Sequence, residues 1–132
     1  MKRTIKIVAT LLFILSVFLY LNFFSSFVFP WQKEDAIKTT LYWGGLAKLP
    51  IEMENIKVRK EGSAFSRTFI IEFNATQKQI ENWIINSKRL KNNFPKVNGE
   101  NKTYEIFPGE NESFGGKVNI ENGKVNIKIS WS

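Results

Sequence analysis

The chain of 132 residues contains neither cysteine nor histidine. The absence of cysteine excludes disulfides and thiolate nucleophiles, and the absence of histidine removes the commonest general base and transition-metal ligand. The sequence also lacks the Gly-x-Ser-x-Gly elbow of serine hydrolases, a glycine-rich phosphate loop and zinc-ligand spacing. We therefore predict a protein that is not an enzyme, with no catalytic residues, no cofactor, no metal site and no identifiable small-molecule ligand.

Positive charge is concentrated at the N-terminus. The formal net charge is +7, from 19 Lys and Arg against 12 Asp and Glu. Lys2, Arg3 and Lys6 precede the long apolar segment, so the remainder carries 16 basic residues against the same 12 acids. That excess of four is ordinary for the surface of a small domain. Nucleic acid is therefore not an expected partner.

Residues 7–29 form an apolar run of 23 residues without a charge. As a helix this run would extend roughly 34 Å, enough to cross a hydrocarbon core of about 30 Å. A cleaved secretory signal is the alternative, but cleavage after Ser25 or Ser26 would require a small residue where Phe23 or Phe24 stands. We predict an uncleaved transmembrane signal anchor over residues 7–29, with the lipid bilayer as its partner.

Basic flanks resist translocation, so the charges around the apolar run predict its orientation. The three basic residues before it place residues 1–6 in the cytoplasm, and residues 31–132 become an extracytoplasmic domain on a bacterial cell membrane. The reversed topology, with a cytoplasmic domain, is the alternative. Trp31 either marks the outer membrane interface or begins the core of the domain.

The outer domain shows an alternation of helix and strand patterns. Residues 34–43 read as a helix with acids in its first turn and Gly44-Gly45 at its end. Residues 55–60 and 65–73 alternate apolar and polar side chains, and the turn at residues 61–63 makes them a hairpin. Thr76 and Gln79 form a capping-box pattern that starts a helix, its apolar stripe runs to Leu90, and Asn92, Asn93 and Pro95 close it.

Three further strands are expected at residues 102–107, 116–121 and 124–131. Asn122-Gly123 is a strong signal for a tight hairpin, and it would pair Ile120 with Val125 and Val118 with Ile127. The predicted fold class is therefore α+β, an antiparallel sheet of about five strands with two helices on one face, preceded by the single transmembrane helix.

Two basic clusters and one aromatic loop element are the candidates for partner binding. The first cluster lies on the first hairpin and the second lies at the C-terminal end of the helix that begins at Thr76, while Trp43 precedes two glycines. Arg67 is unusual because strand alternation puts it on the same face as Phe69. A charged solvent face and ordinary helix-end glycines are the structural explanation of the same features. The candidate residues are Lys57, Arg59, Arg67, Trp43, Lys88 and Arg89.

The leading functional hypothesis is a non-enzymatic, protein-binding module of the bacterial envelope, because the chain combines an anchor with an absence of catalytic motifs. An immunity-like inhibitor of an incoming toxin is the second hypothesis, since such proteins are small and need no catalytic residues. A hydrolase of envelope polymer is the third, and it requires a cleft that gathers carboxylates and lysines with shifted pKa values.

Overall fold

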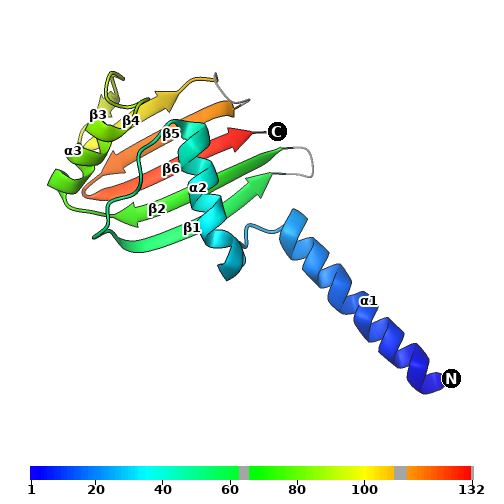
Figure 1. Ribbon diagram of the computed structural model, residues 1–132. Helices are drawn as coiled ribbons and strands as arrows, with labels where there is room; N and C mark the ends of the chain where they lie inside the picture. Colours follow the sequence, from blue (N-terminus) through cyan, green and yellow to red (C-terminus); the bar gives the residue numbers. More distant parts are fainter. Residues whose placement is uncertain (63–65, 109–112, 132) are drawn as a thin grey trace.

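A computed structural model shows one long N-terminal helix followed by an α+β domain (Figure 1). The structure describes residues 1–62, 66–108 and 113–131. Its elements in chain order are α1 (Lys2–Phe23), the 3-10 helix η1 (Pro30–Gln32), α2 (Lys33–Gly44), β1 (Glu54–Gly62), β2 (Arg67–Asn74), α3 (Gln77–Asn86), β3 (Lys96–Asn98), β4 (Asn101–Ile106), β5 (Ser113–Glu121) and β6 (Lys124–Trp131).

Helix α1 is long and apolar enough to cross a membrane, and none of its residues is buried by the rest of the chain. It ends at Phe23, whereas the apolar pattern predicts helix through residue 29. Two contacts account for the earlier end. Ser25 Oγ accepts a hydrogen bond from the Phe27 amide at 3.1 Å, and Lys60 Nζ donates to the Asn22 carbonyl at 2.5 Å. The lysine thus satisfies a carbonyl of the last turn that has no partner within the helix.

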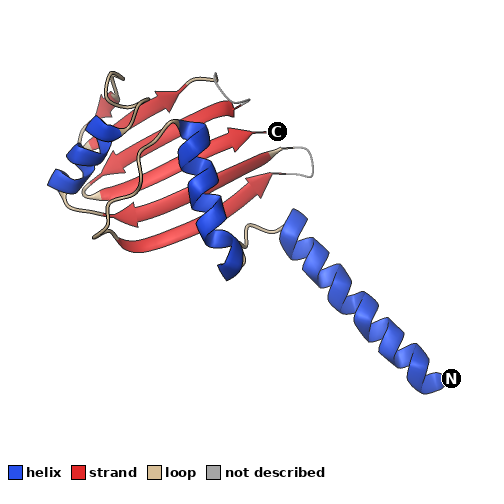
Figure 2. Ribbon diagram, in the orientation of Figure 1, coloured by secondary structure: helices blue, strands red, loops and turns tan. Residues whose placement is uncertain are grey.

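The domain is a layer of helices on one antiparallel sheet (Figure 2). The described strands follow the spatial order β1-β2-β6-β5-β4-β3, so there are six rather than about five. The extra strand is β3, which pairs with β4 through Lys96 and Thr103 and through Asn98 and Asn101. Gly99 makes the connecting turn with a φ of 63°. Both α2 and α3 lie over the same face, as the sequence predicts.

The two expected hairpins are present. Strands β1 and β2 pair with Val58 opposite Ile71, although part of the predicted connection, and Phe65 with it, lies outside the described residues. The second hairpin turns at Asn122 and Gly123, whose φ values of 49° and 77° are those of a tight left-handed turn. Its register joins four buried β-branched residues in the predicted pairs, Ile120 with Val125 and Val118 with Ile127.

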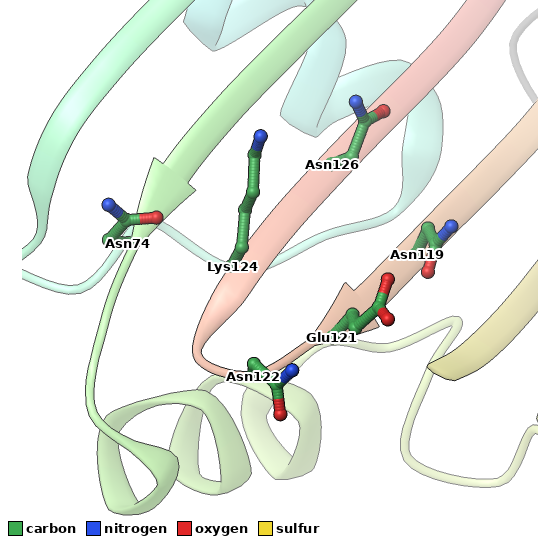
Figure 3. Close-up of a pocket in the computed structure, with 6 residues that line it drawn as sticks. All are labelled: Asn74, Asn119, Glu121, Asn122, Lys124 and Asn126. Atoms are coloured by element: carbon green, nitrogen blue, oxygen red, sulfur yellow. The ribbon is translucent and has the colours of Figure 1, made fainter. Parts of the chain in front are cut away.

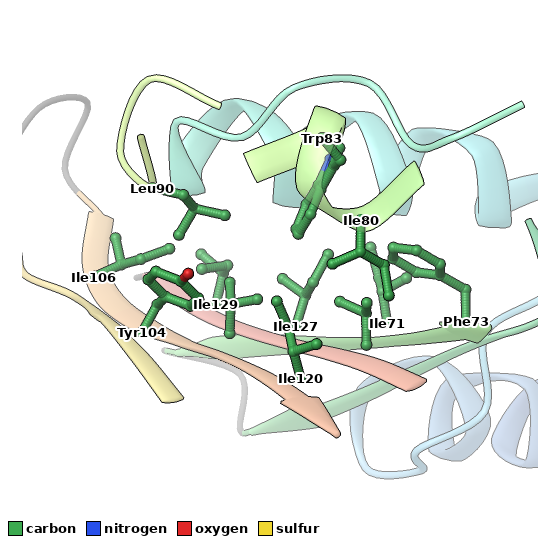
Figure 4. Packing of buried hydrophobic residues seen from close by; sticks show 12 residues of the cluster. Ile71, Phe73, Ile80, Trp83, Leu90, Tyr104, Ile106, Ile120, Ile127 and Ile129 are labelled. Atoms are coloured by element: carbon green, nitrogen blue, oxygen red, sulfur yellow. The ribbon is translucent and has the colours of Figure 1, made fainter. Parts of the chain in front are cut away.

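The core lies between the helices and the covered face of the sheet (Figure 4). The α3 residues Ile80 and Trp83 point onto the strands, and the Trp83 ring meets Phe73 edge-on at 5.9 Å. The predicted capping box at the start of α3 is formed in both directions. The helix ends at Asn86, before the predicted close at Asn92 and Asn93, but Leu90 still fills the core from the following turn and is 1% exposed.

Candidate functional site

The face of the sheet opposite the helices is polar, and a hollow of about 540 Å³ lies at one end of it (Figure 3). None of the six lining residues is aromatic, and each carries a side-chain group that can form hydrogen bonds. Within the described chain Asn119 Oδ1 is a buried oxygen without a hydrogen-bond partner. The lining residues are Asn74, Asn119, Glu121, Asn122, Lys124 and Asn126.

Two of the predicted binding residues, Lys57 and Arg59, lie on this polar face in β1. Arg59 Nη2 forms an ion pair with Glu72 Oε1 at 3.3 Å, and the same oxygen accepts from Asn126 Nδ2 at 2.8 Å. Glu72 also faces Lys124 at 3.8 Å. The Arg59 side chain is half exposed, where such pairs stabilise a fold by at most about 1 kcal/mol. This arrangement is that of a solvated face held by its own polar contacts.

The basic cluster predicted on the first hairpin is divided between the two faces of the sheet. Arg67 and Lys60 share a face with Phe69, as strand alternation predicts, and Lys60 is only 7% exposed. The Arg67 guanidinium lies 5.9 Å from the centre of the Phe23 ring. Burial lowers the pKa of the Lys60 amine, and the neighbouring Arg67 charge lowers it further. These two cations therefore belong to the junction between α1 and the sheet.

Trp43 contributes to packing. Its ring stacks on Trp131 at 5.7 Å, and Trp131 in turn contacts Phe69 at 4.8 Å. Gly45 ends α2 in the left-handed conformation with a φ of 62°, as expected for a glycine just past a helix. The Trp43-Gly44-Gly45 element thus fits the structural explanation of its pattern.

The remaining predicted residues, Lys88 and Arg89, lie beside two exposed aromatic rings. Phe94 is 93% exposed and Phe107 is 67% exposed. Together with the basic residues they line a cavity of about 360 Å³ next to β4. We call this region the Phe94–Phe107 surface. It consists of Lys88, Arg89, Asn92, Asn93, Phe94, Glu105, Ile106 and Phe107.

A set of buried and backbone contacts holds the turn that carries this surface. The Ser87 hydroxyl donates to the Trp83 carbonyl at 2.7 Å and accepts from the Ala47 amide at 2.9 Å. The Arg89 amide donates to the Gly45 carbonyl at 3.1 Å. Asn93 Nδ2 then donates to the Glu105 carbonyl on β4 at 2.8 Å. The exposed rings therefore stand on a fixed support.

The electrostatics of the Phe94–Phe107 surface are basic. Lys88 and Arg89 supply the positive charge, and Glu105 is the one acid among the lining residues. Glu105 Oε1 accepts a hydrogen bond from Lys96 Nζ at 2.8 Å, and this bond and the lysine charge lower the pKa of the carboxyl. Because Lys96 offsets Glu105, the lining acid does not neutralise the charge that Arg89 brings to the cavity.

The aromatic half of this surface is absent from the sequence prediction, which gives only the basic residues. A usable signal is present, because Phe94 and Phe107 each stand directly before a proline. The residue before proline is driven out of helical conformation, and the proline itself cannot donate to a strand ladder. Each phenylalanine is thereby left in a connection rather than in a packed element.

The six predicted binding residues thus occupy four places and do not form one site. Among the described residues, no group of three Asp or Glu side chains is arranged to hold a metal ion. Comparison with family models, with curated proteins and with solved structures finds no match for this chain. The chemistry of its own surfaces is therefore the basis for a functional proposal.

Proposed function

We propose that this chain is a single-pass, non-enzymatic membrane protein whose outer domain binds an acidic segment of another envelope protein. The binding region is the Phe94–Phe107 surface. The observation that carries the proposal is the exposure of two phenylalanines, 93% and 67%, around one cavity that also receives Lys88 and Arg89. Aromatic and arginine side chains are the residues that most often dominate the energy of protein interfaces.

The size and charge of the cavity support a protein segment as the ligand. A volume of about 360 Å³ is at the small end of the range for ligand pockets, and it suits one or two side chains of a docking segment. The charge of Arg89, beside a Glu105 that Lys96 offsets, favours a partner with Asp or Glu next to its apolar residue.

The position of the surface separates it from the bilayer in which α1 would lie. Lys60, in the edge strand β1, contacts the end of α1, whereas the Phe94–Phe107 surface lies beside β4 near the opposite edge (Figure 1). With six strands about 4.8 Å apart, the two edges are separated by roughly 24 Å. The N-terminal basic residues would keep the start of α1 in the cytoplasm, so this surface would point into the extracytoplasmic space.

Photo-crosslinking in intact cells tests the proposal. A photoreactive amino acid is placed in the full-length chain at position 94 or 107, and at position 51 as the control, because Ile51 is fully exposed outside the surface. We expect positions 94 and 107 to capture one protein through an acidic segment, identified by sequencing the linked peptide, and position 51 to capture none. Equal capture at position 51, or no protein captured at positions 94 and 107, contradicts the proposal.

Charge reversal supplies a second arm of the same experiment. The double variant Lys88→Glu with Arg89→Glu leaves both phenylalanines in place and changes only the sign of the surface. We expect it to abolish capture from position 94, because an acidic segment would then meet like charges. The matched control is Lys57→Glu with Arg59→Glu on the polar face, which should leave capture unchanged.

A further inference from the structure

The charge-free part of α1 is short for a membrane span. It runs over residues 7–23, because the helix ends at Phe23. These 17 residues extend roughly 26 Å at 1.5 Å each, about 4 Å less than a typical hydrocarbon core. A span that is too short draws its flanking residues toward the membrane interface. The residues that follow α1 should therefore be suited to the headgroup region.

The chain after α1 turns back along the helix. The Phe29 ring stacks on Phe18 at 5.3 Å and on Trp31 at 4.6 Å. Phe18 precedes the end of α1 by five residues, which is roughly 7.5 Å along the axis. Phe29, at the start of the domain, thus lies beside the last turns of the helix and not beyond the end of the helix.

Large aromatic side chains around this base point outward. Phe24 is 70% exposed, Phe27 is 47% exposed and Trp31 is 68% exposed, although Phe29 between them is buried. The exposure of Trp31 shows that it is not part of the domain core. Aromatic rings at the end of an apolar helix are typical of the membrane–water interface, where one side of the ring is apolar and the other is wet.

Two cations lie at the end of α1. Lys60 Nζ reaches the Asn22 carbonyl at 2.5 Å, its backbone amide donates to the Ser26 carbonyl at 3.1 Å, and Arg67 lies over Phe23. The end of α1 is therefore joined to the β1 edge by hydrogen bonds from both the backbone and the side chain of one residue. If α1 spans a bilayer, the Arg67 guanidinium beside its last residue lies near the lipid phosphates.

We propose that residues 24–31 form an aromatic seat, carried by Phe24, Phe27 and Trp31, that rests in the headgroup layer of the bilayer. The seat holds the domain in one orientation, with the β1 edge toward the lipid and the Phe94–Phe107 surface away from it. This inference rests on the proposed membrane span of α1. The aromatic seat would give the domain a second contact with the same bilayer and would fix the orientation of the domain relative to it.

The absence of cysteine allows a direct test with single labelling sites. Full-length variants Phe13→Cys, Phe24→Cys, Trp31→Cys and Ile51→Cys receive a nitroxide label and are reconstituted in vesicles of phosphatidylcholine and phosphatidylglycerol. Accessibility to dissolved oxygen and to a water-soluble nickel complex then reports the depth of each position. We expect position 13 to be deep, positions 24 and 31 to be several-fold less accessible to nickel than position 51, and position 51 to be aqueous.

The outcomes separate this inference from the proposed anchor. If position 13 lies in the hydrocarbon while positions 24 and 31 are as accessible to nickel as position 51, the anchor stands and the aromatic seat is wrong. If position 13 is itself aqueous, the membrane span is wrong and the seat falls with it. Two seat positions are labelled so that a local disturbance at one of them does not decide the result.

Discussion

The two edges of the sheet carry similar side chains but have different surroundings. At the β1 edge, Lys60 and Arg67 are next to Phe23, and the apolar helix α1 continues from there. Near the β3 edge, Arg89 lies beside Phe94, and the one long apolar helix among the described residues, α1, is at the other edge. Aromatic and basic residues together are thus compatible with two classes of partner, and their neighbours decide which one fits.

The surroundings of the two edges differ in the size of their apolar surface and in their distance from α1. The unburied, charge-free part of α1, residues 7–23, provides a continuous apolar surface of a length that suits a bilayer, and the rings after it extend that surface. The Phe94–Phe107 surface is small, rimmed by polar groups and beside β4, four strand spacings or roughly 19 Å from β1. Such isolated, polar-rimmed apolar groups are typical of protein docking sites. Some of the following predictions compare the β1 edge with the Phe94–Phe107 surface. Others compare the buried residues that hold this surface with the exposed residues that would bind a partner.

The largest expected effect is on stability, from the support beneath the Phe94–Phe107 surface. Leu90 is 1% exposed, so Leu90→Ala should lower the free energy of unfolding by about 2–5 kcal/mol. Chemical denaturation in detergent, followed by tryptophan fluorescence, measures the change. Val97→Ala is the control, because Val97 is 63% exposed and should alter stability by less than about 0.5 kcal/mol. Equal losses from the two variants would show that this turn is not packed as described.

The second effect concerns binding without a change in stability. Phe94→Ser should weaken the affinity for the captured acidic segment by about 2 kcal/mol, or roughly 30-fold, because it removes an exposed aromatic anchor. Titration calorimetry with a synthetic copy of that segment measures the loss. Ile51→Ser, at a fully exposed position elsewhere, should bind as the unmodified protein does. An unchanged affinity in Phe94→Ser excludes this ring as a binding residue.

The third effect is specific to the β1 edge and depends on pH. Burial lowers the pKa of Lys60 below its ordinary value of 10.5, so the folded protein holds this proton less tightly than the unfolded chain does. The free energy of unfolding should therefore gain a favourable contribution as the pH rises through the folded pKa toward 10.5. Lys60→Met should remove that contribution, and Lys57→Met on the exposed polar face should retain it. Parallel alkaline slopes for the protein and Lys60→Met would contradict the burial of this amine.

The smallest effect is kinetic. Neutralising Lys88→Gln and Arg89→Gln should slow association with the acidic segment at low salt and reduce the dependence of the rate on ionic strength, because rim charges steer encounter. Stopped-flow mixing at two salt concentrations measures this. The same substitutions at Lys57 and Arg59 should leave the rate unaltered. If the association rate of the unmodified protein does not depend on salt, these charges do not speed the association.

Sequence patterns predict the local parts of this fold well. The Asn122-Gly123 hairpin and the Thr76–Gln79 capping box depend on residues within a few positions of one another, and both are present as predicted. Strand β3 is absent from the prediction because it has three residues and exists only through its pairing with β4. The early end of α1 also depends on a distant residue, since Lys60 reaches Asn22 from 38 positions away.

The candidate surface is only half visible in the sequence for the same reason. Lys88 and Arg89 stand out as a local charge cluster, but Phe94 and Phe107 are 13 positions apart. They meet because Asn93 bonds to the Glu105 carbonyl and fastens the turn to β4. Strand alternation correctly puts Arg67 on the face of Phe69, yet it gives no sign that Phe23 lies beside it. Local patterns identify the groups, and tertiary contacts decide which of them act together.

Labelling of a single introduced cysteine in intact cells tests the central claim most directly, since the chain has no cysteine of its own. Val97→Cys places a thiol at the exposed β3 edge, close to the Phe94–Phe107 surface. The account predicts that a membrane-impermeant maleimide labels this thiol in whole cells and that the labelled protein sediments with the membranes. Labelling that occurs only after lysis, or a labelled protein that stays in the soluble fraction, would contradict it.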